Sequence, residues 1–255
     1  MRSLVSLVAA VVLSSTVLSA CATGAADDEY ASTEDEAATA GKFALFQAAD
    51  GGWQFHLKSG NGAVLLQSDA YTSRTGAING ILSVQTNGVD AAQYRIVPAA
   101  SGFVLHLVAA NHKVISTSEV HATKSSATRA ITSCVRATTS YLDRREAGST
   151  GARVEVLANE TGKFRFTFFA QSGQTVLSSE SYETEAAAFN GAYVVQTEGQ
   201  NAASYSLNEI SGGFYFTVRA RNNQVVGTSQ AYPTKAAADA AMVALQKLLP
   251  TISVL

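Results

Sequence analysis

The sequence predicts an α+β fold made of four copies of one strand–strand–strand–helix unit. An aromatic residue opens a short alternating apolar run four times, and a second ring follows each one eighteen residues later. The four pairs are Trp53 and Tyr71, Phe103 and His121, Phe164 and Tyr182, and Phe214 and Tyr232. Successive copies are 50, 61 and 50 residues apart, and VQTNG at 84–88 returns as VQTEG at 195–199. The copies therefore form two tandem pairs related by an offset of 111 residues.

The first two strands of each unit enclose a short turn. First strands are expected at 42–48, 93–98, 153–158 and 204–210. In the second strand, as in WQFHLK at 53–58, aromatic and aliphatic residues alternate with polar ones. This period of two is typical of a sheet that is buried on one face. We therefore expect helices to pack on the apolar face of an antiparallel sheet. The other face would expose Gln54, His56, Lys58, Arg165, Tyr215 and Arg219.

A tight turn, a third strand and a helix complete each unit. The turn dipeptides tolerate positive φ angles. They are Asn61-Gly62, Asn111-His112, Ser172-Gly173 and Asn222-Asn223. Third strands are expected at 64–66, 114–115, 176–177 and 225–226. The helices should begin after the N-caps Ser73, Thr123, Thr184 and Thr234, and Gly88 and Gly199 should end two of them.

These motifs resemble the YegP-like family of small bacterial domains. In the first copy they are WQFHL at 53–57, Asn61-Gly62, LLQSDAY at 65–71 and Asn79-Gly80-Ile81. The third copy keeps Tyr182 and Asn190-Gly191, whereas the second has His121 for the tyrosine and the fourth has Ala240-Ala241. The resemblance implies that two units form one sheet, so that this chain holds two YegP-like modules. It implies no activity, because the function of the family is unassigned.

Spacing sets the expected domain boundaries. Eleven extra residues separate the second and third copies, around RREAGSTG at 144–151. The expected domains are module one at 42–146, a linker at 147–151, module two at 152–249 and a C-terminal tail at 250–255.

The N-terminus has the features of a targeting segment. Arg2 precedes an apolar stretch at 4–17 that is shorter than the roughly 20 residues of a membrane-spanning helix. Leu18-Ser19-Ala20-Cys21 then resembles the lipobox of bacterial lipoproteins. This implies that residues 1–20 are a signal peptide and that Cys21 carries the lipid (palmitate chains). A plain secretory signal with a chance cysteine is the alternative.

An acidic segment follows the cysteine. Residues 22–40 hold six acids and no base, which is typical of a disordered tether, here assigned to 21–41. The chain from residue 41 onward then holds 17 lysines and arginines against 14 acids, a balance of +3 that is too weak to predict a nucleic-acid surface. We expect a lipoprotein of the bacterial cell envelope, membrane-anchored through Cys21 and facing the periplasm or exterior.

The recurrent polar residues offer possible binding sites. His56 and His106 occupy matching positions and are a possible metal pair, but no cysteine or carboxylate at ligand spacing completes a site. We therefore predict no metal and no cofactor. Tyr71, Tyr182 and Tyr232 either stack on a ligand or pack against the helix. Asn79 and Asn190 either contact a ligand or mark close helix–sheet packing at the glycine that follows each.

The remaining candidates are serines and one thiol. Ser68, Ser118, Ser179 and Ser229 recur without a nucleophile-elbow motif, so we expect them to bond the backbone. Cys134 lies in an apolar helical pattern and is expected to be a buried thiol. No catalytic residue is predicted.

Three functional hypotheses follow. The first is a non-catalytic binding module that presents its sheet surfaces and open edges to a protein or cell-wall partner. The second is a small-molecule or metal binder, or a weak hydrolase, with a site between the modules near His106, His112 and His121. The third is a structural lipoprotein with no single ligand.

Overall fold

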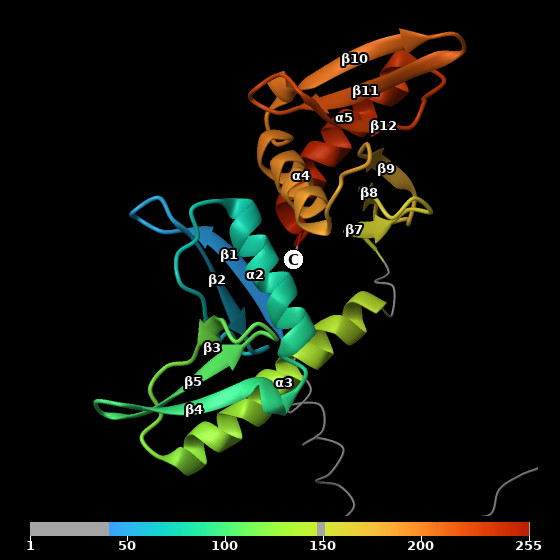
Figure 1. The fold of residues 1–255 in the computed structure, drawn as a ribbon. Coiled ribbons are helices and arrows are strands. Elements are labelled where there is room, and N and C mark those ends of the chain that lie inside the picture. Colours follow the sequence, from blue (N-terminus) through green and yellow to red (C-terminus); the bar gives the residue numbers. More distant parts are fainter. Residues whose placement is uncertain (1–40, 147–150, 255) are drawn as a thin grey trace, which may run out of the picture. The chain divides into compact units, whose positions relative to one another are not determined.

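The computed structural model describes residues 41–146 and 151–254, which contain two antiparallel sheets of six strands (Figure 1). The predicted signal peptide, Cys21, the tether up to residue 40 and most of the linker lie outside the described residues.

Each sheet is made by two consecutive units. The first contains β1 (Lys42–Gln47), β2 (Trp53–Lys58), β3 (Val64–Gln67), β4 (Tyr94–Ala99), β5 (Gly102–Val108) and β6 (Val114–Thr117). Its strand order is β1-β2-β3-β6-β5-β4, so the third strands of the two units meet at the centre. The second contains β7 (Arg153–Ala158), β8 (Phe164–Phe169), β9 (Thr175–Ser178), β10 (Tyr205–Ile210), β11 (Gly213–Arg219) and β12 (Val225–Ser229). Its order, β10-β11-β12-β9-β8-β7, repeats this arrangement, and the fold class is confirmed.

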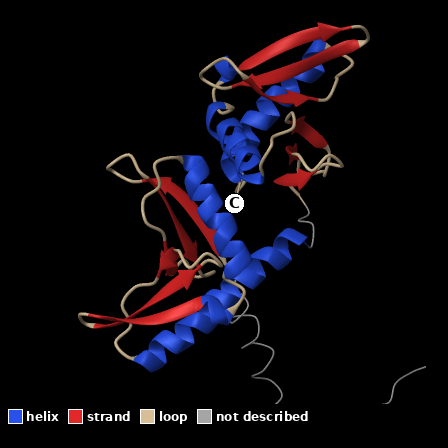
Figure 2. Ribbon diagram, viewed as in Figure 1, coloured by secondary structure: helices blue, strands red, loops and turns tan. Residues whose placement is uncertain are grey.

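Four helices pack on the apolar sheet faces (Figure 2). They are α2 (Arg74–Asn87), α3 (Lys124–Glu146), α4 (Glu185–Glu198) and α5 (Lys235–Leu248). The side chains of the four predicted N-caps each accept a hydrogen bond from the backbone N–H three residues on, as expected. Gly88 and Gly199 follow α2 and α4, but with right-handed φ angles of −73° and −69°. Glycine is required there by space, because a Cβ would come within 2.6 Å of the Val84 carbonyl oxygen at Gly88.

Two short 3-10 turns were not predicted. These are η1 (Ala91–Gln93) and η2 (Ala202–Ser204), and they delay the start of β4 and β10 by one residue relative to the expected strands. Asp90 and Asn201 cap them through their side-chain oxygens. A hydrogen bond between an Asp or Asn side chain and the backbone two residues on favours a turn. Strand propensity alone does not include this effect, so the expected strands begin one residue too early.

The C-terminal segment is packed rather than free. After α5 the chain forms η3 (Leu249–Thr251), and the side chains of Leu249, Ile252 and Val254 are buried. The side-chain amide of Gln196 also donates to the Ile252 carbonyl oxygen. The residues expected to be a tail therefore belong to the core of the second module.

The eighteen-residue spacing has a direct structural cause. Trp53 and Tyr71 form a backbone bridge in which each N–H donates to the other's carbonyl oxygen, at 2.8 and 2.7 Å. The corresponding pairs of the other three copies form the same bridge. Eighteen residues is therefore the length of chain from the start of each second strand to the residue, beyond the third strand, that pairs with it.

The four recurrent serines stabilise the same corner. The Ser179 hydroxyl accepts a bond from the buried Phe166 N–H at 3.0 Å and donates to the Glu180 carbonyl oxygen at 2.7 Å. Ser68, Ser118 and Ser229 make equivalent bonds, as the sequence predicts.

Replacing Ser179 should show what this bond contributes. We expect Ser179→Ala to lower the free energy of unfolding by about 1–3 kcal/mol, because it leaves the buried Phe166 N–H without its acceptor. Chemical denaturation measures the loss. Ser178→Ala is the matched control, since Ser178 lies half-buried on the neighbouring position, and it should cost less than half as much.

Cys134 is a buried thiol on α3, 1% exposed, and burial raises its pKa to about 12. In a Cys21→Ala chain it is the sole thiol, because the sequence contains two cysteines. We expect an aromatic disulfide reagent to leave this thiol unreacted in the native protein at pH 8 and to titrate it fully in guanidinium. Rapid reaction of the native protein would contradict the burial.

Candidate functional site

The recurrent tyrosines pack against helical glycines. The Tyr71 ring stacks on Phe55, with centroids 6.2 Å apart, and its hydroxyl lies 2.4 Å from where a Cβ on Gly80 would stand. Tyr182, Phe166 and Gly191 repeat this arrangement. Glycine is therefore placed in the middle of α2 and α4 to admit a tyrosine ring, despite its cost of about 1 kcal/mol in a helix.

These tyrosines remain protonated at neutral pH. Burial, followed by Asp69, raises the pKa of Tyr71, and burial, followed by Glu180, raises that of Tyr182. Burial also raises the pKa of Tyr232, which stacks on Phe216. Each of the three rings packs on a buried phenylalanine, and a ligand contact for them stays a prediction.

The two asparagines stand next to the packed glycines. Asn79 is exposed and Asn190 is half-buried. Tyrosine packing explains the glycine that follows each asparagine. A ligand contact by either asparagine stays a prediction.

His56 and His106 lie in one row across the first sheet but are not neighbours. Cross-strand pairing joins His56 to Gln67, Gln67 to Thr117, and Thr117 to His106. Three strand spacings of about 4.8 Å place the two imidazoles roughly 14 Å apart, too far to share a metal ion. The described part of the chain also contains no cluster of three or more histidine, cysteine, aspartate or glutamate residues placed to hold a metal.

His56 is held neutral by its surroundings. Its ring packs edge-on against Phe46, with centroids 4.8 Å apart. Burial, with a smaller contribution from Lys58, lowers its pKa below the usual value. A neutral imidazole in this position can accept or donate one hydrogen bond to a ligand on the open sheet face.

In the matching row of the second sheet, five of the six residues carry hydroxyls. The row joins Glu155, Thr167, Ser178, Thr228, Thr217 and Ser206, one from each strand. Thr167 and Ser178 are 3.3 Å apart through their hydroxyl oxygens. The two outer faces therefore differ in chemistry, since one presents imidazoles and the other hydroxyls.

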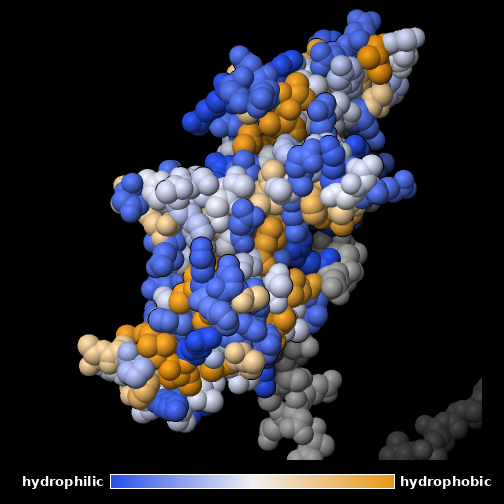
Figure 3. Space-filling view, viewed as in Figure 1, coloured by the Kyte–Doolittle hydropathy of each residue, from blue (hydrophilic) through white to orange (hydrophobic). Residues whose placement is uncertain are grey.

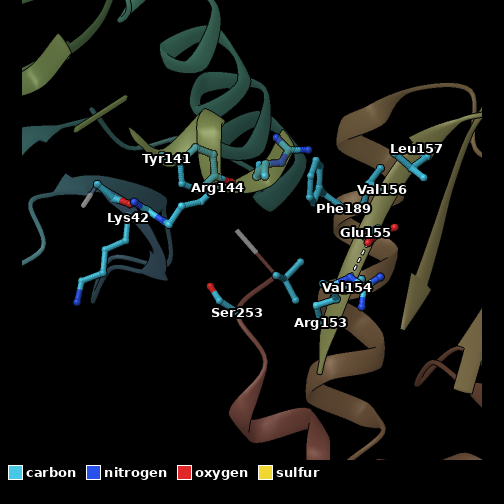
Figure 4. Close-up of a pocket in the computed structure, with 13 residues that line it drawn as sticks. Lys42, Tyr141, Arg144, Arg153, Val154, Glu155, Val156, Leu157, Phe189 and Ser253 are labelled. Atoms are coloured by element: carbon cyan, nitrogen blue, oxygen red, sulfur yellow. Dashed lines mark hydrogen bonds and ion pairs between the residues drawn. The ribbon is translucent and has the colours of Figure 1, made fainter. Parts of the chain in front are cut away.

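A groove lies where α3 ends and β7 begins (Figure 4). We name it the junction groove. Its volume is about 530 Å³, and its wall includes residues of both modules. It is formed by Lys42, Arg144, Arg145, the β7 residues 153–157, Phe189 and Val254. His106, His112 and His121 do not line it, so the structure places the cavity away from the three histidines that suggested a site between the modules.

Three arginines are fixed around the junction groove. Arg145 donates to the Gln85 side-chain oxygen at 2.8 Å, lies 3.5 Å from a Glu185 carboxylate oxygen, and stands over the Phe189 ring. Arg153 pairs with Glu155 at 2.5 Å and stands 4.1 Å from the Phe169 ring centroid. Such contacts leave each guanidinium further donors for a ligand, because it carries five N–H groups.

Arg144 completes the set. It donates to neutral acceptors, the Gly41 carbonyl oxygen and the Ser140 hydroxyl. Both Arg144 and Arg145 belong to the last turn of α3, which ends at residue 146, the boundary expected for module one. Basic residues in a last helical turn suit the negative end of the helix dipole, and this signal was available in the sequence.

The chain matches a family described as "Domain of unknown function (DUF1508)" four times, at residues 48–94, 99–140, 159–205 and 211–254. It is 43% identical over 94 residues to a UPF0339 protein of Acinetobacter baylyi, covering 36% of this chain and 85% of that protein. It is 42% identical over 88 residues to the UPF0339 protein YegP of Escherichia coli K12, covering 34% and 80%.

The chain also matches a solved structure over part of its length. The solution structure of yegP from E. coli, described as a protein of unknown function, is 40% identical and covers 39% of this chain and 87% of that one, with a TM-score of 0.37. Because the family matches cover more than half of the sequence, the chain belongs to the DUF1508 family, in four copies, and its YegP-like character is confirmed.

Among the described residues, no helix has the length and apolar character needed to span a membrane.

Proposed function

We propose that this protein is a non-catalytic binding protein of the bacterial cell envelope, held on a membrane by lipid on Cys21, and that the junction groove receives its partner. The observation that carries the binding role is the groove itself. Its volume of about 530 Å³ lies within the 300–1,000 Å³ typical of ligand sites, which often form where domains meet.

The anchoring half of the proposal rests on the N-terminal sequence. Two or three acyl chains on Cys21 would give stable membrane attachment, whereas one chain binds only reversibly. Residues 22–40, which follow Cys21, hold six acids and no base, a composition that suits a tether between the lipid and the modules.

Metabolic labelling tests the anchor. Cells that express the full chain and are fed an alkyne analogue of palmitate should label it, and the protein should sediment with the membranes. Cys21→Ala should abolish the label and release the protein into the soluble fraction. Cys134→Ala is the matched control and should keep both properties. Labelling that survives Cys21→Ala would refute the proposed anchor.

A small-molecule ligand is the second candidate, because a groove of this volume also accommodates one. Native mass spectrometry of the protein purified from its own cells would reveal a bound mass. A metabolite that occupies the groove stoichiometrically would favour this alternative over a macromolecular partner.

A further inference from the structure

We propose that the junction groove binds an extended acidic peptide segment, which joins the second sheet as a seventh strand beside β7. This deepens the proposed function and rests on it. Three features of the groove lead to this partner: an open strand edge, an excess of positive charge and an exposed aliphatic side chain.

The open edge belongs to β7. Among the described residues this strand pairs only with β8, and five consecutive β7 residues line the groove. The Phe166 N–H and carbonyl both bond to Ser179, toward β9. Because the direction alternates along an antiparallel strand, the backbone of the next residue, Thr167, bonds to its β7 partner Glu155.

The same alternation fixes the neighbours of Glu155. The N–H and carbonyl groups of Val154 and Val156 point away from β8, toward the groove. An extended peptide that lies in the groove can bond to these groups, which is how peptides add to sheet edges in known recognition modes.

Charge favours an acidic occupant. Lys42, Arg144, Arg145 and Arg153 line the groove, against the single carboxylate of Glu155. Arg145 forms an ion pair with Glu185, and Arg153 forms one with Glu155. In contrast, Arg144 donates to neutral acceptors and Lys42 is exposed. The surplus positive charge therefore comes from the end of α3 and the start of β1.

An aliphatic contact supplies the third feature. Leu157 is 63% exposed, more than any other large apolar side chain in the described part of the chain. In Figure 3, apolar side chains reach the visible surface in separate patches among hydrophilic ones. An incoming strand of alternating acidic and aliphatic residues would cover Leu157 with its aliphatic side chains and point its carboxylates to the other face, toward Arg144 and Arg145.

The test uses a fluorescent peptide of alternating glutamate and valine, blocked at both ends, and the full Cys21→Ala chain. Fluorescence anisotropy should show saturable binding. Val154→Pro removes one groove-facing N–H without removing a bond to β8, and it should weaken binding at least tenfold. Val154→Ala keeps the N–H and should bind within about twofold of the parent chain.

Further controls separate the edge from the charge and from folding. Leu207→Pro makes the same kind of change on β10, at the opposite edge of the sheet, where Leu207 is the counterpart of Val156, and it should leave binding unchanged. Arg144→Gln should weaken binding several-fold. A lysine–valine peptide, and the acidic peptide N-methylated at alternate amides, should both fail to bind. Circular dichroism checks that each variant is folded.

Each contrary result has a defined meaning. No binding of the acidic peptide, or equal binding by Val154→Pro and the parent chain, overturns strand addition. Dimerisation in sedimentation velocity that Val154→Pro abolishes would make a second copy the occupant and would also overturn it. The proposed function fails separately, if the native protein in cells has no partner at the groove. It survives if Val154→Pro still captures such a partner.

Discussion

Phe166→Ala should lower the free energy of unfolding by about 3–5 kcal/mol, one of the two largest effects expected in this protein. The Phe166 side chain is fully buried on β8, and its ring contacts those of Phe168 and Tyr182. Its removal costs the transfer free energy of the ring and leaves a cavity that a close-packed core fills only in part. Guanidinium denaturation followed by tyrosine fluorescence measures the loss.

Arg165→Ala is the control on the same strand. Arg165 is exposed on the opposite sheet face, so this change should stay within about 0.5 kcal/mol of the parent. A loss below about 1 kcal/mol for Phe166→Ala would show that the aromatic face of β8 is not the core of the second module.

Leu249→Ala should cost about 2–5 kcal/mol of unfolding free energy, although Leu249 lies only six residues before Leu255. Its side chain is fully buried, and a Cβ on Gly199 would stand 2.6 Å from one of its methyl groups. The end of the chain therefore seals the core beside α4, and truncating the side chain opens a cavity there.

Val243→Ala on α5 is the matched aliphatic control. Val243 is 49% exposed, and its truncation should change the free energy of unfolding by at most about 0.5 kcal/mol. If Leu249→Ala were equally mild, the buried segment after α5 would contribute little to the core of the second module.

The repeat could be derived from the sequence because its signals are local and occur four times. Alternation in WQFHLK, the Asn-Gly turns and the capping residues each depend on a few neighbouring residues. Positive φ angles fall at Gly62, His112, Gly173 and Asn223, the second residue of each predicted turn. The serine-to-backbone bonds could also be predicted, because the four serines recur without a nucleophile-elbow motif around them.

The groove and the packed C-terminus depended on tertiary contacts that no local pattern encodes. The repeat spacing indicated where module one ends, at residue 146, but not that Arg144 and Arg145 line a groove. Leu249 directly follows α5, Ile252 and Val254 come after Pro250, and the burial of all three depends on packing against α4. The distance between His56 and His106 likewise required the strand order, which places two strands between them.

The most direct test of a binding role places a photo-crosslinking amino acid at the junction groove in living cells. We would replace Leu157 with benzoylphenylalanine in the full chain with Cys21 intact, and Val243 in a matched variant, then irradiate intact cells. We expect one discrete crosslinked product from position 157 and none from position 243. No product from 157, or the same products from both positions, would contradict the claim that this groove receives a partner.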